Sequence, residues 1–145
     1  MAFADYKPLK TEIRFGNDLQ YSANIRALNV ADISRIYGLF EPEIEQIYDT
    51  LLIDGEFDAS RLAENFPSVI ALTLRVAPDL ITEIIVTSSG EDDARETIMS
   101  MALADQADVI GGILGITAKA EGGLGKLMGL VIALLQKSGK AKTGA

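Results

Sequence analysis

The residue types that most often carry chemistry in proteins are scarce in this chain. Its 145 residues include no cysteine and no histidine. Disulfides, Cys/His zinc sites and an imidazole general base are therefore excluded. Carboxylates, hydroxyl groups and lysines remain, and the chemistry that they could do depends on how they are spaced.

Two turn-like segments come close to known ion-binding loops but lack residues that those loops require. A calcium loop starting at Asp54 would need Gly at its sixth position, where Ala59 stands. A phosphate loop over residues 122–127 would need Gly where Ala120 stands and Ser or Thr at Leu127. We therefore expect a surface turn and a hinge between helices, with neither a metal ion nor a nucleotide cofactor.

The densest group of acids is Glu91, Asp92 and Asp93. Three adjacent residues of a helix cannot share one face, so they do not form a carboxylate pair for acid/base catalysis. Acids are favourable in the first turn of a helix, which predicts a solvated helix start here. Nowhere does a nucleophile stand beside a recognisable base and orienting group, so the sequence predicts a protein that is not an enzyme.

The charge balance limits the partners. Thirteen basic and 21 acidic residues give a net charge of −8, which would repel a nucleic-acid backbone. The longest apolar stretch, Leu124–Leu135, contains Lys126 and is shorter than the roughly 20 residues needed to cross a bilayer. We expect no stable membrane insertion, and because residues 1–8 do not resemble a secretory signal, no export.

A strand-like alternation of apolar and polar residues opens the chain. It covers Ile13 and Phe15, and then Leu19–Ile25, on either side of Gly16–Asp18. This pattern predicts a β-hairpin over residues 11–28. An isolated hairpin is marginal in water, so its apolar face must pack on helices or its edge must pair with another chain.

From residue 29 the apolar spacing becomes helical. Asn29 can cap a helix that has Asp32 at its third position, Pro42 and Pro78 suit helix starts, and Gly90 suits a helix end. The sequence therefore predicts a mainly α protein, in which an N-terminal β-hairpin is followed by a compact bundle of about six helices.

The expected organisation is one domain with short extensions. Its 48% hydrophobic content allows a core without disulfides. We expect an N-terminal arm over residues 1–10, a single domain over residues 11–136 and a flexible Lys-rich tail over residues 137–145. Within the domain, residues 11–28 are the hairpin and residues 29–136 are helical.

One helical segment, running from Leu103 to Thr117, is unusually rich in glycine. Gly111, Gly112 and Gly115 thin its apolar face, which predicts that another element packs closely against it. A flexible joint is expected to follow over residues 118–125, before a last helix. This glycine spacing is more consistent with close packing in a water-soluble protein than with a membrane helix pair.

Several segments occur in an order that resembles a known family. Ala27–Ile33 opens the helical part, Val76–Ile85 is a helix entered through Ala-Pro, and Glu91–Ala94 is acidic. The segment Met101–Ile110 has a Gln at its centre and is followed by Leu114–Thr117. This order resembles the tail assembly chaperones of long-tailed bacteriophages, also called pre-tape-measure proteins. The chain departs from the family where Ala104 replaces a proline and Ala118 replaces an aromatic residue.

The resemblance implies a binding role without a cofactor. Such a chaperone binds the phage tape measure protein, keeps it soluble and promotes polymerisation of the tail tube around it. The partners would be the tape measure protein and the tail-tube protein. Apart from the resemblance, a homo-oligomer of this chain is also an open expectation. The resemblance also implies action in the host bacterial cytoplasm, absence from the mature virion, and a longer form made by ribosomal frameshifting near residues 139–142.

For the partner-binding face, the sequence favours two helical segments that contain more apolar residues than one helix stripe needs. Apolar residues are most often buried, so the same residues could instead belong to the core. Both the partner-binding and the core interpretation stay open. The candidates are Leu103, Gln106, Ile110, Ile113, Leu114, Thr117, Leu127, Leu130 and Leu134.

Two other functions remain as alternatives. The chain could be a minor tail or connector protein of the virion, whose hairpin adds to the sheet of a neighbour. It could also be a small holin-like membrane protein that uses the apolar segments after Val109.

Overall fold

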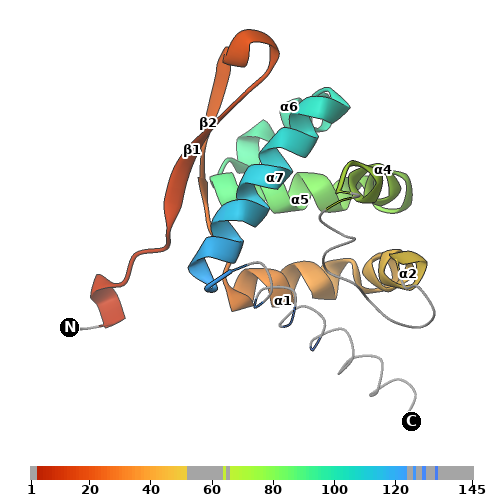
Figure 1. The fold of residues 1–145 in the computed structure, drawn as a ribbon, viewed down its shortest axis with the longest axis horizontal. Coiled ribbons are helices and arrows are strands. Elements are labelled where there is room, and N and C mark those ends of the chain that lie inside the picture. The colour runs from red at the N-terminus through yellow and green to blue at the C-terminus, as the bar shows by residue number, and fades with distance from the viewer. Residues whose placement is uncertain are drawn as a thin grey trace.

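A computed structural model describes residues 3–51, 64, 66–123, 126, 129 and 133. Over these residues a two-stranded hairpin stands against one side of a group of helices, and an N-terminal arm leads away from the hairpin (Figure 1). The prediction of a mainly helical protein with an N-terminal β-hairpin is confirmed. The calcium-loop candidate at residues 54–59, the expected last helix and the Lys-rich tail fall largely or wholly outside the described residues.

The hairpin consists of β1 (Lys10–Phe15) and β2 (Tyr21–Arg26). The strands are antiparallel, with Cα partners running from Lys10 opposite Arg26 to Phe15 opposite Tyr21. Gly16 and two non-glycine residues, Asp18 and Leu19, have positive φ in the connecting turn. Leu19 therefore lies in the turn, although the alternation of the sequence placed it on the second strand.

The described helical part contains six α-helices and one 3₁₀ helix, at Asp92–Ala94. The bounds of the helices are α1 (Val30–Leu39), α2 (Glu41–Leu51), α4 (Phe66–Val76), α5 (Pro78–Ser89), α6 (Arg95–Met99) and α7 (Leu103–Ala120). The acids at 91–93 are exposed before α6, as the sequence predicted.

Local sequence determines several helix ends. The Asn29 side chain accepts a hydrogen bond from the Asp32 N–H at 2.8 Å, and the Asp32 carboxylate accepts one from the Asn29 N–H at 3.0 Å. This capping box satisfies two backbone donors at the start of α1. Pro78 is the first residue of α5, and Gly90, in the left-handed conformation, ends it.

Two clusters of buried side chains form the core, and α5 contributes to both. The larger cluster joins the hairpin to α5 and α7 through residues such as Ile25, Ile81 and Ile113. The smaller cluster joins α1, α2 and α5 through Ile36, Ile47 and Leu80. Since Leu80 and Ile81 are adjacent but belong to different clusters, α5 buries more than one face. A helix that is apolar on several sides is expected at the centre of a fold.

The hairpin rests directly on the glycine-rich part of α7. A Cβ added at Gly112 would overlap the Cδ1 atom of Ile13 in β1, and it would lie 3.4 Å from the Cδ1 atom of Ile25 in β2. A Cβ added at Gly115 would meet nothing within 4 Å. Close packing was predicted for this glycine-rich segment; it occurs at Gly112 and does not occur at Gly115.

The end of α7 differs from the sequence-based expectation. The expected joint began at residue 118, but α7 continues through Ala120, and Ala118 is buried. The chain leaves the helix at Gly122 and Gly123, whose φ angles are +87° and +128°. Within the described residues, no helix has the length and apolarity needed to cross a bilayer.

The contrast between the two glycines allows a test of how the hairpin is held. We expect Gly112→Val to lower the free energy of unfolding by about 1–3 kcal/mol, because the new side chain displaces Ile13 and Ile25. Gly115→Val should leave stability unchanged or raise it slightly, because valine is a better helix former than glycine. Urea unfolding followed by circular dichroism measures both variants. Equal midpoints would contradict this account of the packing.

Candidate interaction surface

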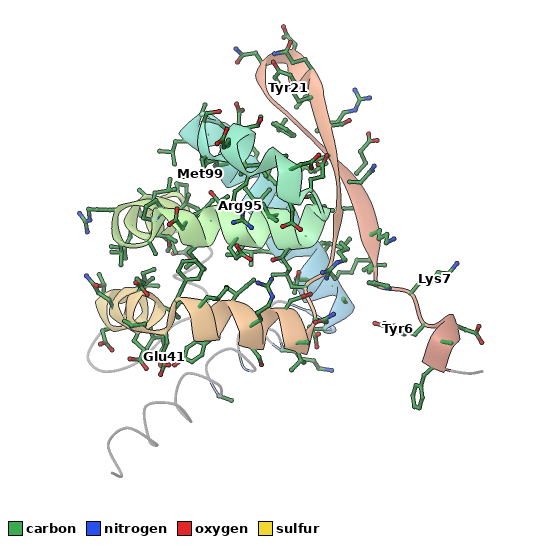
Figure 2. All side chains as sticks on the ribbon, turned by 180° about the vertical axis from the view of Figure 1, so that it is seen from behind. Tyr6, Lys7, Tyr21, Glu41, Arg95 and Met99 are labelled. Atoms are coloured by element: carbon green, nitrogen blue, oxygen red, sulfur yellow. The ribbon has the colours of Figure 1, made fainter. Side chains whose placement is uncertain are left out.

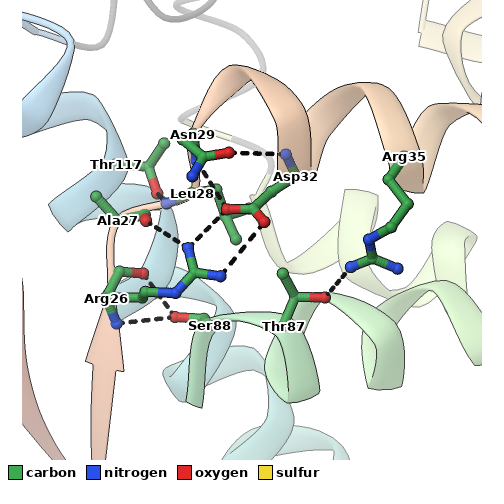
Figure 3. Close-up of polar contacts among 9 residues, drawn as sticks. All are labelled: Arg26, Ala27, Leu28, Asn29, Asp32, Arg35, Thr87, Ser88 and Thr117. Carbon is green, nitrogen blue, oxygen red and sulfur yellow. Dashed lines mark hydrogen bonds and ion pairs between the residues drawn. The ribbon is translucent and has the colours of Figure 1, made fainter. Parts of the chain in front are cut away.

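The connection from β2 to α1 is held by a network of polar contacts (Figure 3). The Arg26 guanidinium donates to both carboxylate oxygens of Asp32, at 2.6 and 3.3 Å. It also donates to the carbonyl oxygen of Ala27 at 3.1 Å. Because Asp32 belongs to the capping box of α1, this ion pair links the last residue of the hairpin to the first turn of the helix.

Ser88 joins the same strand to α5. Its hydroxyl group accepts a hydrogen bond from the Arg26 N–H at 3.2 Å and donates one to the Arg26 carbonyl oxygen at 2.7 Å. Both main-chain groups of Arg26 that point away from β1 are therefore satisfied by one buried side chain. An unpaired buried backbone group would destabilise the fold, so Ser88 makes the close approach of strand and helix favourable.

Thr117 links the chain just before α1 to α7. Its hydroxyl oxygen accepts a hydrogen bond from the Leu28 N–H at 3.0 Å, and both residues are buried. Leu28 lies between β2 and the start of α1. The segment between the hairpin and α1 is thus bonded to α5 on one side and to α7 on the other.

Glu83 lies between two arginines and links α1, α5 and α6. One carboxylate oxygen accepts from Arg35 and the other from Arg95, each at 2.8 Å. Arg35 also donates to the Thr87 hydroxyl at 2.6 Å (Figure 3). The glutamate side chain is mostly buried, whereas both arginine side chains are partly exposed.

The charges of this network change the acidity of its carboxyl groups. Burial by itself would raise the pKa of Asp32, but the hydrogen bonds from Arg26 and from the Asn29 N–H outweigh it and lower that pKa. Burial would also raise the pKa of Glu83. The hydrogen bonds from Arg35 and Arg95 outweigh that effect, and the pKa of Glu83 is lowered. Both groups favour the folded state when ionised.

The lowered pKa of Asp32 predicts how stability depends on pH. Its contribution is fully present above the unfolded value of about 4 and is lost as the pH falls through the lower folded value. We expect Asp32→Asn to lower the free energy of unfolding at pH 7 by about 1–2 kcal/mol, because it weakens a cap and a charge-assisted hydrogen bond. The deficit should shrink toward pH 2.5, as the native carboxylate also becomes neutral.

The matched control for this measurement is Asp108→Asn, which changes an exposed aspartate on α7. Its unfolding free energy should equal that of the native chain at both pH values. A deficit of Asp32→Asn that is the same at pH 7 and pH 2.5 would contradict the ionic account of the Arg26–Asp32 contact.

Gln106 holds the turn between α6 and α7, residues Met99–Leu103, which we call the α6–α7 corner. Its amide Nε2 donates to the carbonyl oxygens of Ile98 and Met101, each at 3.1 Å. Gln106 is buried, whereas Met99 is 54% exposed and Leu103 is 52% exposed. The corner therefore presents two large apolar side chains on a turn that a buried amide keeps in place.

A second exposed apolar region lies on the N-terminal arm. Phe3 is 99% exposed and Tyr6 is 77% exposed, while Leu9, just before β1, is 38% exposed. The arm that carries Tyr6 projects away from the helices (Figure 2). These neighbouring exposed aromatic side chains make the arm a candidate contact surface.

No chemical site accompanies these surfaces in the described part of the chain. Its His, Cys, Asp and Glu side chains form no group of three that could hold a metal ion. A hollow of about 270 Å³ lies beside β2, with Lys10, Asn24 and Ser89 in its wall. Nothing in its lining pairs a nucleophile with a base.

Comparison with known proteins then identifies the family. The family model described as pre-tape measure protein matches residues 1–145. The chain belongs to the pre-tape measure protein family of bacteriophages. Its members are phage tail proteins associated with the tape measure, so the resemblance noted in the sequence is confirmed. Neither a curated protein nor a solved structure gives a match.

In this pre-tape measure protein the predicted partner-binding residues have different surroundings. Leu103 is exposed and Leu114 is partly buried. Leu127, Leu130 and Leu134 lie outside the described residues. The remaining four are all at least 90% buried, namely Gln106 at 6%, Ile110 at 2%, Ile113 at 0% and Thr117 at 1% relative exposure.

The Gln-to-Thr spacing that supported the resemblance serves the fold of this pre-tape measure protein. Gln106 bonds to carbonyl groups of the α6–α7 corner, and Thr117 bonds to the N–H before α1. In the folded conformation described here a partner reaches Leu103 directly, but Ile113 only if α7 moves. A partner-binding role for the nine residues stays a prediction.

Sequence analysis did not single out Met99, Phe3 or Tyr6 as contact residues. Phe3 and Tyr6 precede the first periodic segment, so no hydrophobic pattern included them. Met99 fits a helical stripe, but it is the last residue of the five-residue helix α6 and is exposed there. The available signal was the presence of two aromatic residues in an arm that was not expected to join the core.

Proposed function

We propose that this protein is a non-enzymatic tail assembly chaperone, which binds the phage tape measure protein, keeps it soluble and promotes tail-tube polymerisation around it. The match of the pre-tape measure family over residues 1–145 carries the proposal. The family associates the chain with the tape measure, and the chaperone action is the additional step that we infer. A helix-rich client much longer than this chain needs its apolar surface covered until the tube encloses it.

Exposed apolar side chains on the body of the protein support a client-binding role. Met99 and Leu103 form the α6–α7 corner, and the contacts of Gln106 keep that turn rigid. An amphipathic helix of the client could dock its apolar stripe on such a rigid apolar surface with little loss of conformational entropy. The net charge of −8 opposes aggregation while this surface is free.

The proposal includes where and when the protein acts. It would bind the tape measure protein in the host bacterial cytoplasm, contact the tail-tube protein during polymerisation, and leave before the virion is complete. A longer frameshifted form would carry additional contacts to the tube. These features follow from the chaperone role, and they distinguish it from a minor tail or connector protein, which stays in the particle.

Mass spectrometry of purified phage particles separates these two roles. The chaperone proposal predicts that peptides of this chain are abundant in infected cells and absent from gradient-purified virions, because the protein dissociates when the tube closes. Peptides of the tail-tube protein serve as the positive control. Stoichiometric recovery of this chain from virions would overturn the chaperone role.

Co-expression measures client binding directly. Expressed alone, the tape measure protein of the same phage should be largely insoluble, and co-expression with this chain should move most of it to the soluble fraction. The double variant Met99→Lys/Leu103→Lys should lower the soluble fraction several-fold, since two charges would have to be buried against an apolar client.

The matched control places the same changes on α1, where two other large apolar side chains are exposed. Val30 is 68% exposed and Leu39 is 59% exposed. Val30→Lys/Leu39→Lys should solubilise the client as well as the native chain does. Circular dichroism confirms that both double variants fold. Equal loss in the two variants would rule out the corner as the specific contact, and no solubilisation by the native chain would overturn the proposed function.

A further inference from the structure

The outer edge of β1 has main-chain groups available for another strand. The Ala27 N–H donates to the Leu9 carbonyl oxygen at 2.8 Å, which continues the ladder by one pair. In an antiparallel ladder, hydrogen-bonded pairs alternate with non-hydrogen-bonded pairs. Since Leu9 and Ala27 are a bonded pair, the odd-numbered residues of β1 bond to β2. The N–H and C=O groups of Lys10, Glu12 and Arg14 therefore point away from the hairpin.

The opposite edge of the hairpin confirms this alternation and shows how an edge is closed in this protein. Arg26 stands opposite Lys10, and its outward N–H and C=O groups are both bonded by Ser88 of α5. Among the described residues, an outward group of β1 has one contact, in which the Thr11 hydroxyl lies 3.5 Å from the Glu12 carbonyl oxygen. That distance is beyond the usual range for a hydroxyl donor.

The position of β1 leaves this edge accessible. In Figures 1 and 2 no described α-helix lies on the outer side of β1, whereas β2 lies next to α5. One face of β1 packs on the core through Ile13 and Phe15, with Ile13 against Gly112 of α7, and the other face carries the exposed side chains of Lys10, Glu12 and Arg14. An added strand would therefore meet an open ladder with one apolar face and one charged face.

The alternating charges make β1 complementary to a second copy of itself. In an antiparallel pair centred on Glu12, Glu12 would face Glu12 and Lys10 would face Arg14, so every opposed pair would repel. A shift of two residues, centred on Thr11, places Lys10 of each copy opposite Glu12 of the other. This shift keeps outward-pointing residues opposite one another, as the ladder requires.

The same register covers apolar side chains that one copy alone leaves in water. Leu9, at 38% exposure, stands opposite the partly buried Ile13 of the second copy. The arm with Phe3 and Tyr6 then continues along the hairpin turn of the second copy, where Leu19 is 55% exposed. Charge and apolar contact favour the same arrangement, and the outward main-chain groups of Lys10 and Glu12 can bond to each other in it.

We propose that two copies of this protein associate through β1, antiparallel and centred on Thr11, to form a four-stranded sheet with exchanged arms. A C₂ pair of this kind is isologous, so each contact occurs twice. The inference stands on the hairpin and its arm and does not rest on the chaperone role. Failure of either leaves the other unaffected.

Cysteine cross-linking tests the register, because the native chain has no cysteine background. At the centre of the proposed pair the two Thr11 residues form a non-hydrogen-bonded pair, whose Cα atoms lie about 4.5 Å apart. This spacing allows a disulfide. We expect purified full-length Thr11→Cys to give a covalent dimer under mild oxidation, resolved on a non-reducing gel.

Ser22→Cys is the matched control, since Ser22 is exposed on the other strand of the same hairpin. It should cross-link at least about tenfold more slowly, because the two residues meet only by collision. Equal rates for the two cysteines, or a native chain that sediments as a monomer at 100 μM (a concentration chosen on the order of weak dimer affinities), would overturn the proposal. Faster cross-linking of Ile13→Cys than of Thr11→Cys would overturn the register.

Exchanging the charges at residues 10 and 12 separates loss of the Lys10–Glu12 pairs from a general loss of structure. In the Thr11→Cys background, Glu12→Lys places lysine opposite lysine and Lys10→Glu places glutamate opposite glutamate. Each should cross-link about tenfold less when alone. An equimolar mixture restores both opposite-charge pairs and should recover the dimer as a heterodimer. If each variant loses the dimer and the mixture does not recover it, the proposed pairing of Lys10 with Glu12 is wrong.

Discussion

The arrangement of this protein depends on satisfying the main-chain groups where the hairpin turns into the first helix. Residues 26–29 lie between the hydrogen-bonded ladder of the hairpin and the hydrogen bonds of α1. This connection contacts both α5 and α7. Ser88 bonds the N–H and C=O of Arg26, and Thr117 bonds the N–H of Leu28. Without these hydroxyl groups, three buried polar groups would have lost water without gaining a partner.

The same junction orients the parts that can reach other molecules. Arg26 pairs with Asp32 within the capping box, which sets the direction of α1 relative to the hairpin. Gly112 lets Ile13 approach the axis of α7, so the hairpin lies close against that helix. The body thereby keeps β1 and the arm on its outside, while the α6–α7 corner is supported separately by Gln106. The two exposed apolar regions therefore rest on different supports.

The packing shows that many of the apolar residues of α7 that were predicted to bind a partner belong to the core. Sequence composition favoured α7 as a partner-binding helix because it contains more apolar residues than one stripe requires. In the structure, Ile110 and Ile113 are buried in the larger core cluster, which includes residues of the hairpin, α4, α5 and α6 as well as α7. The large apolar side chains that are exposed lie instead at helix ends, on the hairpin and on the arm.

By itself, the sequence determined the features that arise from neighbouring residues. The hairpin, the capping box at Asn29, the start of α5 at Pro78 and its end at Gly90 all follow from contacts within a few positions, so local patterns predict them. The family followed from the order of such segments. Tertiary structure alone decided that Thr117, 89 residues from Leu28, would bond to it, and that Gly112 rather than Gly115 would face the hairpin. Those outcomes depend on how separate elements pack, and the spacing of residues along one element contains no information about which neighbour will cover it.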